Sequence, residues 1–275
     1  MGRGKADADV AGFAGAALPP RRAMAQPHVG TLFYLPLRGR AECLRMMLHY
    51  AQLPFTDEVI SNEDWPARKA SMPEGRGAEF PNRPVGNRGL PVLQLPDGSL
   101  MPESTDIASH IAAAAGPPLL PADPEAAASA KRLYDQSQSL PLAWPMVCLV
   151  RFPVEQAEAI MNGEILGEWM AAPKSFGDLL PALRALAAEL GDRPFFGGDR
   201  PHYGDFGVWK QADSFRLLDP AASASLGSAW GAWIDRVASL PGVAEYLAQR
   251  PGLRSEDAGY PGSIIVECAD PSSRI

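Results

Sequence analysis

Residues 30–60 constrain the fold of this chain more than any other segment. Residues 30–35 are an apolar run typical of a short strand, and Pro36 with Gly39 predicts a turn after it. Residues 40–52 then have helical periodicity, with polar positions spaced around an otherwise apolar helix: Glu42, Arg45, His49 and Gln52. Residues 55–60 form a second apolar run. A helix that connects two parallel strands predicts a right-handed β-α-β unit and a mostly buried helix.

The following segments extend this unit to a complete small domain. Residues 62–72 predict a short helical turn, and residues 90–104, "LPVLQLPDGSLMPES", predict two strands joined at Asp97-Gly98, a strong hairpin signal. A helix is expected over residues 104–115, with Ser104 or Thr105 as its N-cap. The order β-α-β-α-β-β-α predicts an α/β thioredoxin-like domain.

The second half of the chain has only helical patterns. Helices are expected over residues 124–139, 146–171, 176–190, 203–218, 228–240 and 243–249. We therefore predict a thioredoxin-like domain over residues 28–117 and an all-helical domain over residues 124–255. Residues 1–27 are expected to be a disordered extension and residues 256–275 a flexible tail.

Charge and residue usage exclude several classes of function. The formal net charge of −7 and the pI near 5.2 argue against a nucleic-acid-binding protein, which has a basic surface. No apolar run is long enough for a membrane-spanning helix. Three cysteines and four histidines lack the spacing of a metal site, so we expect none.

Four stretches, in this order, are similar to the cytosolic glutathione transferase family, and to its sigma class in particular, which includes the haematopoietic prostaglandin D synthase type. They are "FYLPLRGRAECLR", "NEDWPARKASMP", "LPVLQLPDGSLMPES" and "PGVAEYLAQRPGL". The resemblance implies a glutathione-binding thioredoxin-like domain followed by a helical domain. It also implies a cytoplasmic, homodimeric, detoxifying enzyme that uses glutathione as co-substrate and attacks small hydrophobic electrophiles.

Tyr34 is the catalytic residue that this resemblance implies. It precedes Arg38-Gly39-Arg40 with the spacing of the family's thiol-activating tyrosine. A thiol with a pKa near 8.5 is only slightly ionised at neutral pH, and the thiolate is the nucleophile. A phenol stays protonated at pH 7 and can donate a hydrogen bond to that sulfur. Without the other motifs, Tyr34 would read as a packed strand aromatic.

The resemblance also implies the groups that hold glutathione along its length. Leu90 would pair its backbone with the cysteinyl part, before a cis-proline at Pro91. Ser104 would donate to the γ-glutamyl carboxylate at a helix N-terminus. Glu103 stands where the sigma class usually has Gln and could pair with the γ-glutamyl ammonium.

Four further residues are implied at the remaining parts of the peptide. Trp65 and Lys69 would contact the glycyl end, Lys69 as a point charge. Arg40 would reach toward the peptide, and Asp135 toward glutathione bound to the neighbouring subunit. Each could instead be surface charge or rim packing. Asp205, in "HYGDF", resembles a structural helix-start acid, with His202 at the cap position in place of Ser or Thr.

Departures from the family pattern, at Glu103, at His202 and in a long loop, keep other functions open. The loop over residues 73–89 is about twice as long as the corresponding loop of the family. Its arginines could attract an acidic substrate or an adjacent subunit, or they could be solvated surface charges. One alternative is a glutathione-dependent isomerase of the prostaglandin type. The other is a non-catalytic protein with the glutathione transferase fold. Targeting to an organelle by the N-terminal extension also stays open.

Overall fold

A computed structural model of the protein describes residues 27–35, 38–61, 64–75, 88–140, 179–218 and 220–249. The expected helix over residues 146–171 and most of the long loop lie outside these residues. So do the two tails and nearly all of residues 140–151, which the resemblance implies as a wall of the electrophile pocket. Within the described residues, no helix is long and apolar enough to cross a membrane, and no cluster of His, Cys, Asp or Glu could hold a metal ion.

The first half forms a four-stranded mixed sheet in the order β2-β1-β3-β4. The strands are β1 (Thr31–Tyr34), β2 (Thr56–Val59), β3 (Val92–Gln94) and β4 (Leu100–Pro102). β1 pairs with β2 in parallel and with β3 in antiparallel orientation, and β3 pairs with β4 as the predicted hairpin. This is the thioredoxin-like arrangement that the order of elements predicted.

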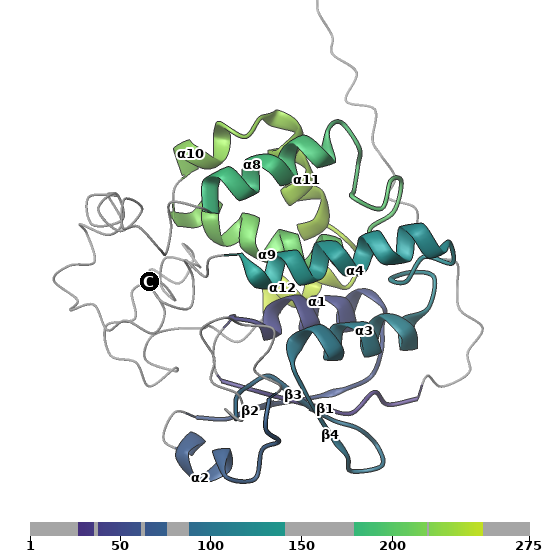
Figure 1. Ribbon diagram of the computed structural model, residues 1–275, viewed down its shortest axis with the longest axis vertical. Helices are drawn as coiled ribbons and strands as arrows, with labels where there is room; N and C mark the ends of the chain where they lie inside the picture. Colours follow the sequence, from purple (N-terminus) through teal and green to yellow (C-terminus); the bar gives the residue numbers. More distant parts are fainter. Residues whose placement is uncertain are drawn as a thin grey trace, which may run out of the picture.

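Three helices cover the two faces of the sheet: α1 (Ala41–Tyr50), α2 (Trp65–Lys69) and α3 (Ser104–Ala115). α1 and α3 lie between the sheet and the second half of the protein, whereas α2 lies on the opposite side of the sheet (Figure 1). Side chains alternate along β1, so its neighbouring residues serve different faces. The guanidinium of Arg68, from α2, lies over the ring of Phe33, and that of Arg45, from α1, lies over the ring of Tyr34.

The described residues of the second half form helices, as expected for them. They are α4 (Pro124–Ser139), α8 (Leu179–Leu190), α9 (Tyr203–Leu218), α10 (Pro220–Ala224), α11 (Ser228–Ala238) and α12 (Val243–Gln249). α9 runs through the centre and packs against α4, α10 and α11 (Figure 1). Its core contains fully buried Phe206, Trp209 and Trp233. The sequence pattern missed α10, a short helix without a clear apolar period.

α9 begins at a buried carboxylate. Asp205 accepts hydrogen bonds from the backbone N–H groups of Phe196 (2.8 Å) and His202 (3.0 Å) and from the indole N–H of Trp233 (3.1 Å). The side chain of Asp205 is fully buried. This confirms the structural role predicted for Asp205. Its carboxylate satisfies the His202 N–H at the helix start, and its bond with Trp233 ties the helix to α11.

A buried ionic network joins the two halves. Arg38, just before α1, contacts Asp213 of α9 (2.7 Å) and Glu42 of α1 (3.2 Å). Tyr246 of α12 donates to the other oxygen of Glu42 (2.7 Å). Glu42 is fully buried, so the polar positions of this helix do not form a solvated face. His49, another of these polar positions, is half-buried and stacked on the ring of Tyr246.

The N-terminus of α3 corrects one expectation. Ser104 is the first helical residue, and the cap position belongs to Glu103, whose carbonyl accepts the first helical bond from the Ile107 N–H (3.0 Å). The Glu103 side chain makes no capping hydrogen bond. Neither Ser104 nor Thr105 is the cap. The backbone has non-helical dihedral angles at Glu103 and is already helical at Ser104.

Candidate glutathione-binding site

Tyr34 lies at the end of β1, beside the start of α1. Its hydroxyl oxygen accepts a hydrogen bond from the backbone N–H of Arg40 (2.9 Å), and the residue is 7% exposed. A hydroxyl that accepts a hydrogen bond still carries its own hydrogen, so it is chemically able to donate as well. The positive end of the helix dipole also lies on this side of the ring. Tyr34 is thus a buried aromatic whose hydroxyl lies at the start of α1, and its role as a thiol activator stays a prediction.

Gly39 makes this placement possible. Its φ is +39°, in the region that favours glycine, and a Cβ added there would overlap the Tyr34 hydroxyl and ring. The turn that the sequence predicted from Pro36 and Gly39 thus has a second purpose, because its glycine allows the phenol to approach the backbone. Any side chain at residue 39 would displace Tyr34.

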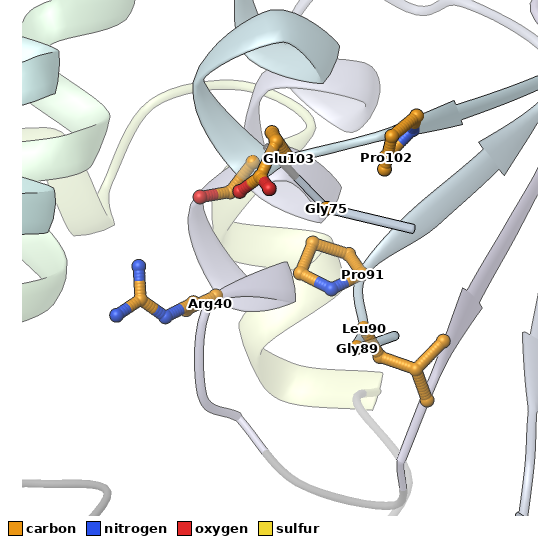
Figure 2. A pocket seen from close by; sticks show the side chains of 8 residues that line it. Arg40, Gly75, Gly89, Leu90, Pro91, Pro102 and Glu103 are labelled. Carbon is orange, nitrogen blue, oxygen red and sulfur yellow. The ribbon is translucent and has the colours of Figure 1, made fainter. Parts of the chain in front are cut away.

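A pocket lies beside this turn, between the start of α1, the start of β3 and the start of α3. Figure 2 shows Arg40, Pro91 and Glu103 around it, contributed by these three segments. Its full lining is Arg40, Gly75, Gly89, Leu90, Pro91, Pro102, Glu103 and Ser104. Five predicted residues are therefore brought together. Nothing in the sequence singled out the other three lining residues: Gly75, Gly89 and Pro102.

The Leu90–Pro91 peptide bond is cis, as predicted. Leu90 and Pro91 are both buried, and β3 starts at the next residue. The bond places the backbone of residues 89–91 at the wall of the pocket. Backbone groups at this position are suited to pairing with an extended peptide.

Glu103 has a backbone conformation that is unusual for a residue other than glycine, with φ 70° and ψ 120°. Such conformations cost about 1–3 kcal/mol and cluster at ligand sites. Here the conformation places a carboxylate and the first N–H groups of α3 in the lining of one pocket. The pocket therefore offers positions for both an ammonium and a carboxylate, the two charged groups of an α-amino acid.

Ser104 is supported from the helical half. Its hydroxyl donates to the side-chain oxygen of Gln138 on α4 (3.4 Å), and Gln138 donates in turn to the Ser137 hydroxyl (3.2 Å). Gln211 of α9 donates to the Ser137 carbonyl (2.8 Å). A hydroxyl has one proton to donate, so a ligand carboxylate at Ser104 competes with Gln138 for it. The sequence analysis missed Gln138, since nothing local links it to Ser104.

Four predicted residues are not in the lining of this pocket: Tyr34, whose hydroxyl accepts from the N–H of the lining residue Arg40, and Trp65, Lys69 and Asp135. Trp65 is half-buried at the first residue of α2 and packs against the core, and Lys69 is exposed at the end of that helix. Asp135 forms an ion pair with Lys131 on the surface of α4. Their predicted contacts with glutathione stay predictions, which for Asp135 involve a second subunit.

Cys43 is the nearby thiol and is not suited to act as a nucleophile. It is fully buried on α1 and contacts the hydroxyl of Tyr134 (3.2 Å). Burial raises the pKa of its thiol. A thiol held protonated and closed off from solvent is unreactive, so Cys43 is not a candidate nucleophile of this site.

A thioredoxin-like domain with this pocket, followed by a helical domain, defines the glutathione transferase fold. The solved structure of the glutathione S-transferase from Ascaris lumbricoides shares this fold with a TM-score of 0.60 at 22% identity, covering 82% of this chain and 98% of that one. The structure of rat hPGDS with a quinoline gives 0.58 at 20% identity over similar shares. The predicted fold class is confirmed.

Sequence comparisons extend this result. The family model "Glutathione S-transferase, C-terminal domain" matches residues 167–249. The hematopoietic prostaglandin D synthase of Gallus gallus is 27% identical over 225 residues, which cover 80% of this chain and 96% of that protein. A probable glutathione S-transferase 6 of Caenorhabditis elegans is 37% identical over 81 residues, about a third of its length. These matches show that the chain is similar to sigma-like glutathione S-transferases.

Proposed function

We propose that the protein is a glutathione S-transferase in which Tyr34 stabilises the glutathione thiolate. The observation that carries the proposal is the position of the Tyr34 hydroxyl, bonded to the Arg40 N–H, beside a pocket that Arg40 itself lines. The relatives named as glutathione S-transferases support the same activity. The co-substrate glutathione would supply the reactive sulfur, since the buried Cys43 is not suited to do so.

The proposed binding mode follows from the chemistry of the pocket. The γ-glutamyl carboxylate would lie at the N-terminus of α3 near Ser104, and its ammonium near Glu103. The cysteinyl backbone would pair with Leu90, which places the thiol toward Tyr34. The thiolate then forms a carbon–sulfur bond with the electrophile, and the leaving group departs with the electron pair of the broken bond.

The wider properties follow the family. We propose a homodimer in the cytoplasm that detoxifies small hydrophobic electrophiles, with the glutathione-binding domain over residues 28–117 and the helical domain over residues 124–255. Trp65, Lys69 and, from the other subunit, Asp135 would contact the peptide's remaining charged ends. Size-exclusion chromatography with light scattering tests the dimer directly.

Glutathione binding and the pH dependence of conjugation test the proposed function. We expect glutathione to bind by calorimetry and to react with a chlorinated aromatic substrate at a rate governed by an apparent pKa below that of the free thiol, about 8.5. Because the thiolate is the reactive form, the rate should be high above the apparent pKa and fall as the pH drops through it. Absence of binding would contradict the proposal.

Ser104→Ala should weaken glutathione binding while sparing the chemical step. A lost hydrogen bond to a charged group is worth about 1.5–3 kcal/mol, so we expect KM for glutathione to rise about tenfold or more with kcat nearly unchanged. Ser109→Ala, on the same helix, removes a hydroxyl that donates to the Thr105 carbonyl and should leave KM unchanged. An equal loss of kcat in Ser104→Ala would contradict a binding role.

A second candidate function is a glutathione-dependent isomerase. It is favoured by the match to the Gallus gallus hematopoietic prostaglandin D synthase, which spans nearly all of that protein. An isomerase would use the same thiolate on an endoperoxide and release glutathione unchanged. Product analysis separates the two, because only conjugation consumes glutathione.

A further inference from the structure

Arg45 lies over the aromatic face of Tyr34. Its guanidinium carbon is 5.7 Å from the centre of the ring, within the range of a cation–π interaction. Both residues are buried, with Arg45 4% and Tyr34 7% exposed. Cation–π interactions contribute most when the cation is removed from water, as here.

The guanidinium is held in this position from the sheet. Asp57, on β2, accepts from Arg45 Nε (2.8 Å) and from Nη2 (3.2 Å), a two-point contact that fixes the plane of the group. The other carboxylate near Arg45 is Glu42 on its own helix, and Arg38 and Tyr246 occupy the two oxygens of Glu42. Arginine stays protonated throughout the working pH range, so its charge over the ring is permanent.

We propose that Arg45 is a positioning residue for the thiol-activating phenol, and that its charge over the ring makes the Tyr34 hydroxyl a stronger hydrogen-bond donor. A positive charge at the ring face stabilises electron density that moves onto the ring as the hydroxyl gives up its proton. The Arg40 N–H, bonded to the same oxygen, acts in the same direction. Tyr34 is thus polarised from two sides, at its ring face by Arg45 and at its oxygen by the Arg40 N–H.

The chain offers a matched control on the other face of the sheet. Arg68 lies over the ring of Phe33 at 5.5 Å and pairs with Glu58, as Arg45 does with Tyr34 and Asp57. Phe33 has no hydroxyl to polarise. Arg68→Met therefore removes an arginine that lies over a ring, though one whose side chain is 43% exposed, without touching the proposed effect.

The test measures the pKa of Tyr34 in the protein without glutathione, by ultraviolet titration of each variant against the same protein carrying Tyr34→Phe. Arg45→Met should raise this pKa by about one unit, and Arg45→Lys, which keeps the charge, should recover most of the change. Arg68→Met should leave it unchanged. If Arg45→Met fails to fold, Asp57→Asn, which loosens the guanidinium, should give a smaller shift in the same direction.

The rate readout rests on the proposed function, whereas the titration does not. With glutathione present, Arg45→Met should lower conjugation at neutral pH about five- to tenfold and raise the apparent pKa of the rate, with KM changed less than about twofold. An unchanged Tyr34 pKa in both Arg45→Met and Asp57→Asn would overturn the inference. A shifted Tyr34 pKa without any conjugation in the wild type would instead uphold it and reject the proposed activity.

Discussion

Tyr34→Phe should lower the conjugation rate about 100-fold and leave the dissociation constant of glutathione nearly unchanged. The phenol has no expected contact with the charged ends of the peptide, so binding does not depend on it. Its hydrogen bond to the thiolate is worth about 1.5–3 kcal/mol, which is roughly a 10- to 150-fold change in rate. Stopped-flow or steady-state kinetics with a chlorinated aromatic, beside calorimetric titration with glutathione, measures both quantities.

Tyr50→Phe is the matched control. Tyr50 is also buried, at the end of α1, with its ring against Phe206. Removing its hydroxyl should leave both the rate and the binding constant within about twofold of the wild type. Full turnover in Tyr34→Phe would show that the proposed mechanism is wrong, whatever the binding result.

Asp205→Asn should lower the free energy of unfolding by about 3 kcal/mol or more. The substitution keeps the shape of the side chain but replaces an acceptor oxygen with a donor, facing the N–H groups of Phe196, His202 and Trp233. Each bond to the buried carboxylate contributes about 1.5–3 kcal/mol, and an unsatisfied buried donor costs about 1–3 kcal/mol. Urea denaturation followed by the tryptophan signal measures the change.

Asp235→Asn serves as its control on the neighbouring helix. The Asp235 side chain is 72% exposed and pairs only with Arg216 among the contacts described for it. Exposed ion pairs contribute about 0–1 kcal/mol, so stability should change little. Equal losses in the two variants would mean that Asp205 does not anchor the start of α9.

Local sequence signals predicted most of the fold. The Asp97-Gly98 turn, the apolar runs and the Pro- and Gly-marked helix ends depend on backbone preferences within a few residues, and the strands and α3, α4, α9 and α12 fall where they were expected. α10 lacked such a signal. The capping residue of α3 was assigned wrongly, because Ser104 is a good cap by composition while the conformation of Glu103 is set by the turn from β4.

The candidate site was predictable in its motif residues and not in the residues behind them. Tyr34, Leu90, Pro91 and Ser104 occur in short stretches whose order and spacing indicate a family. Gln138 reaches Ser104 from another domain, across a contact between residues 34 positions apart. No sequence pattern encodes that pairing, because the partner is chosen by the packing of α4 on α3.

Helix α1 illustrates what the local sequence determines and what tertiary structure adds. The sequence alone determined that residues 41–50 form a helix with polar positions at regular spacing, since both properties depend only on the local chain. Tertiary structure decided what these positions do: Glu42 is buried against α12, and Arg45 is held by Asp57 over Tyr34. The reason is physical. A charged side chain can be buried only where a partner offsets the loss of water, and those partners come from distant parts of the chain.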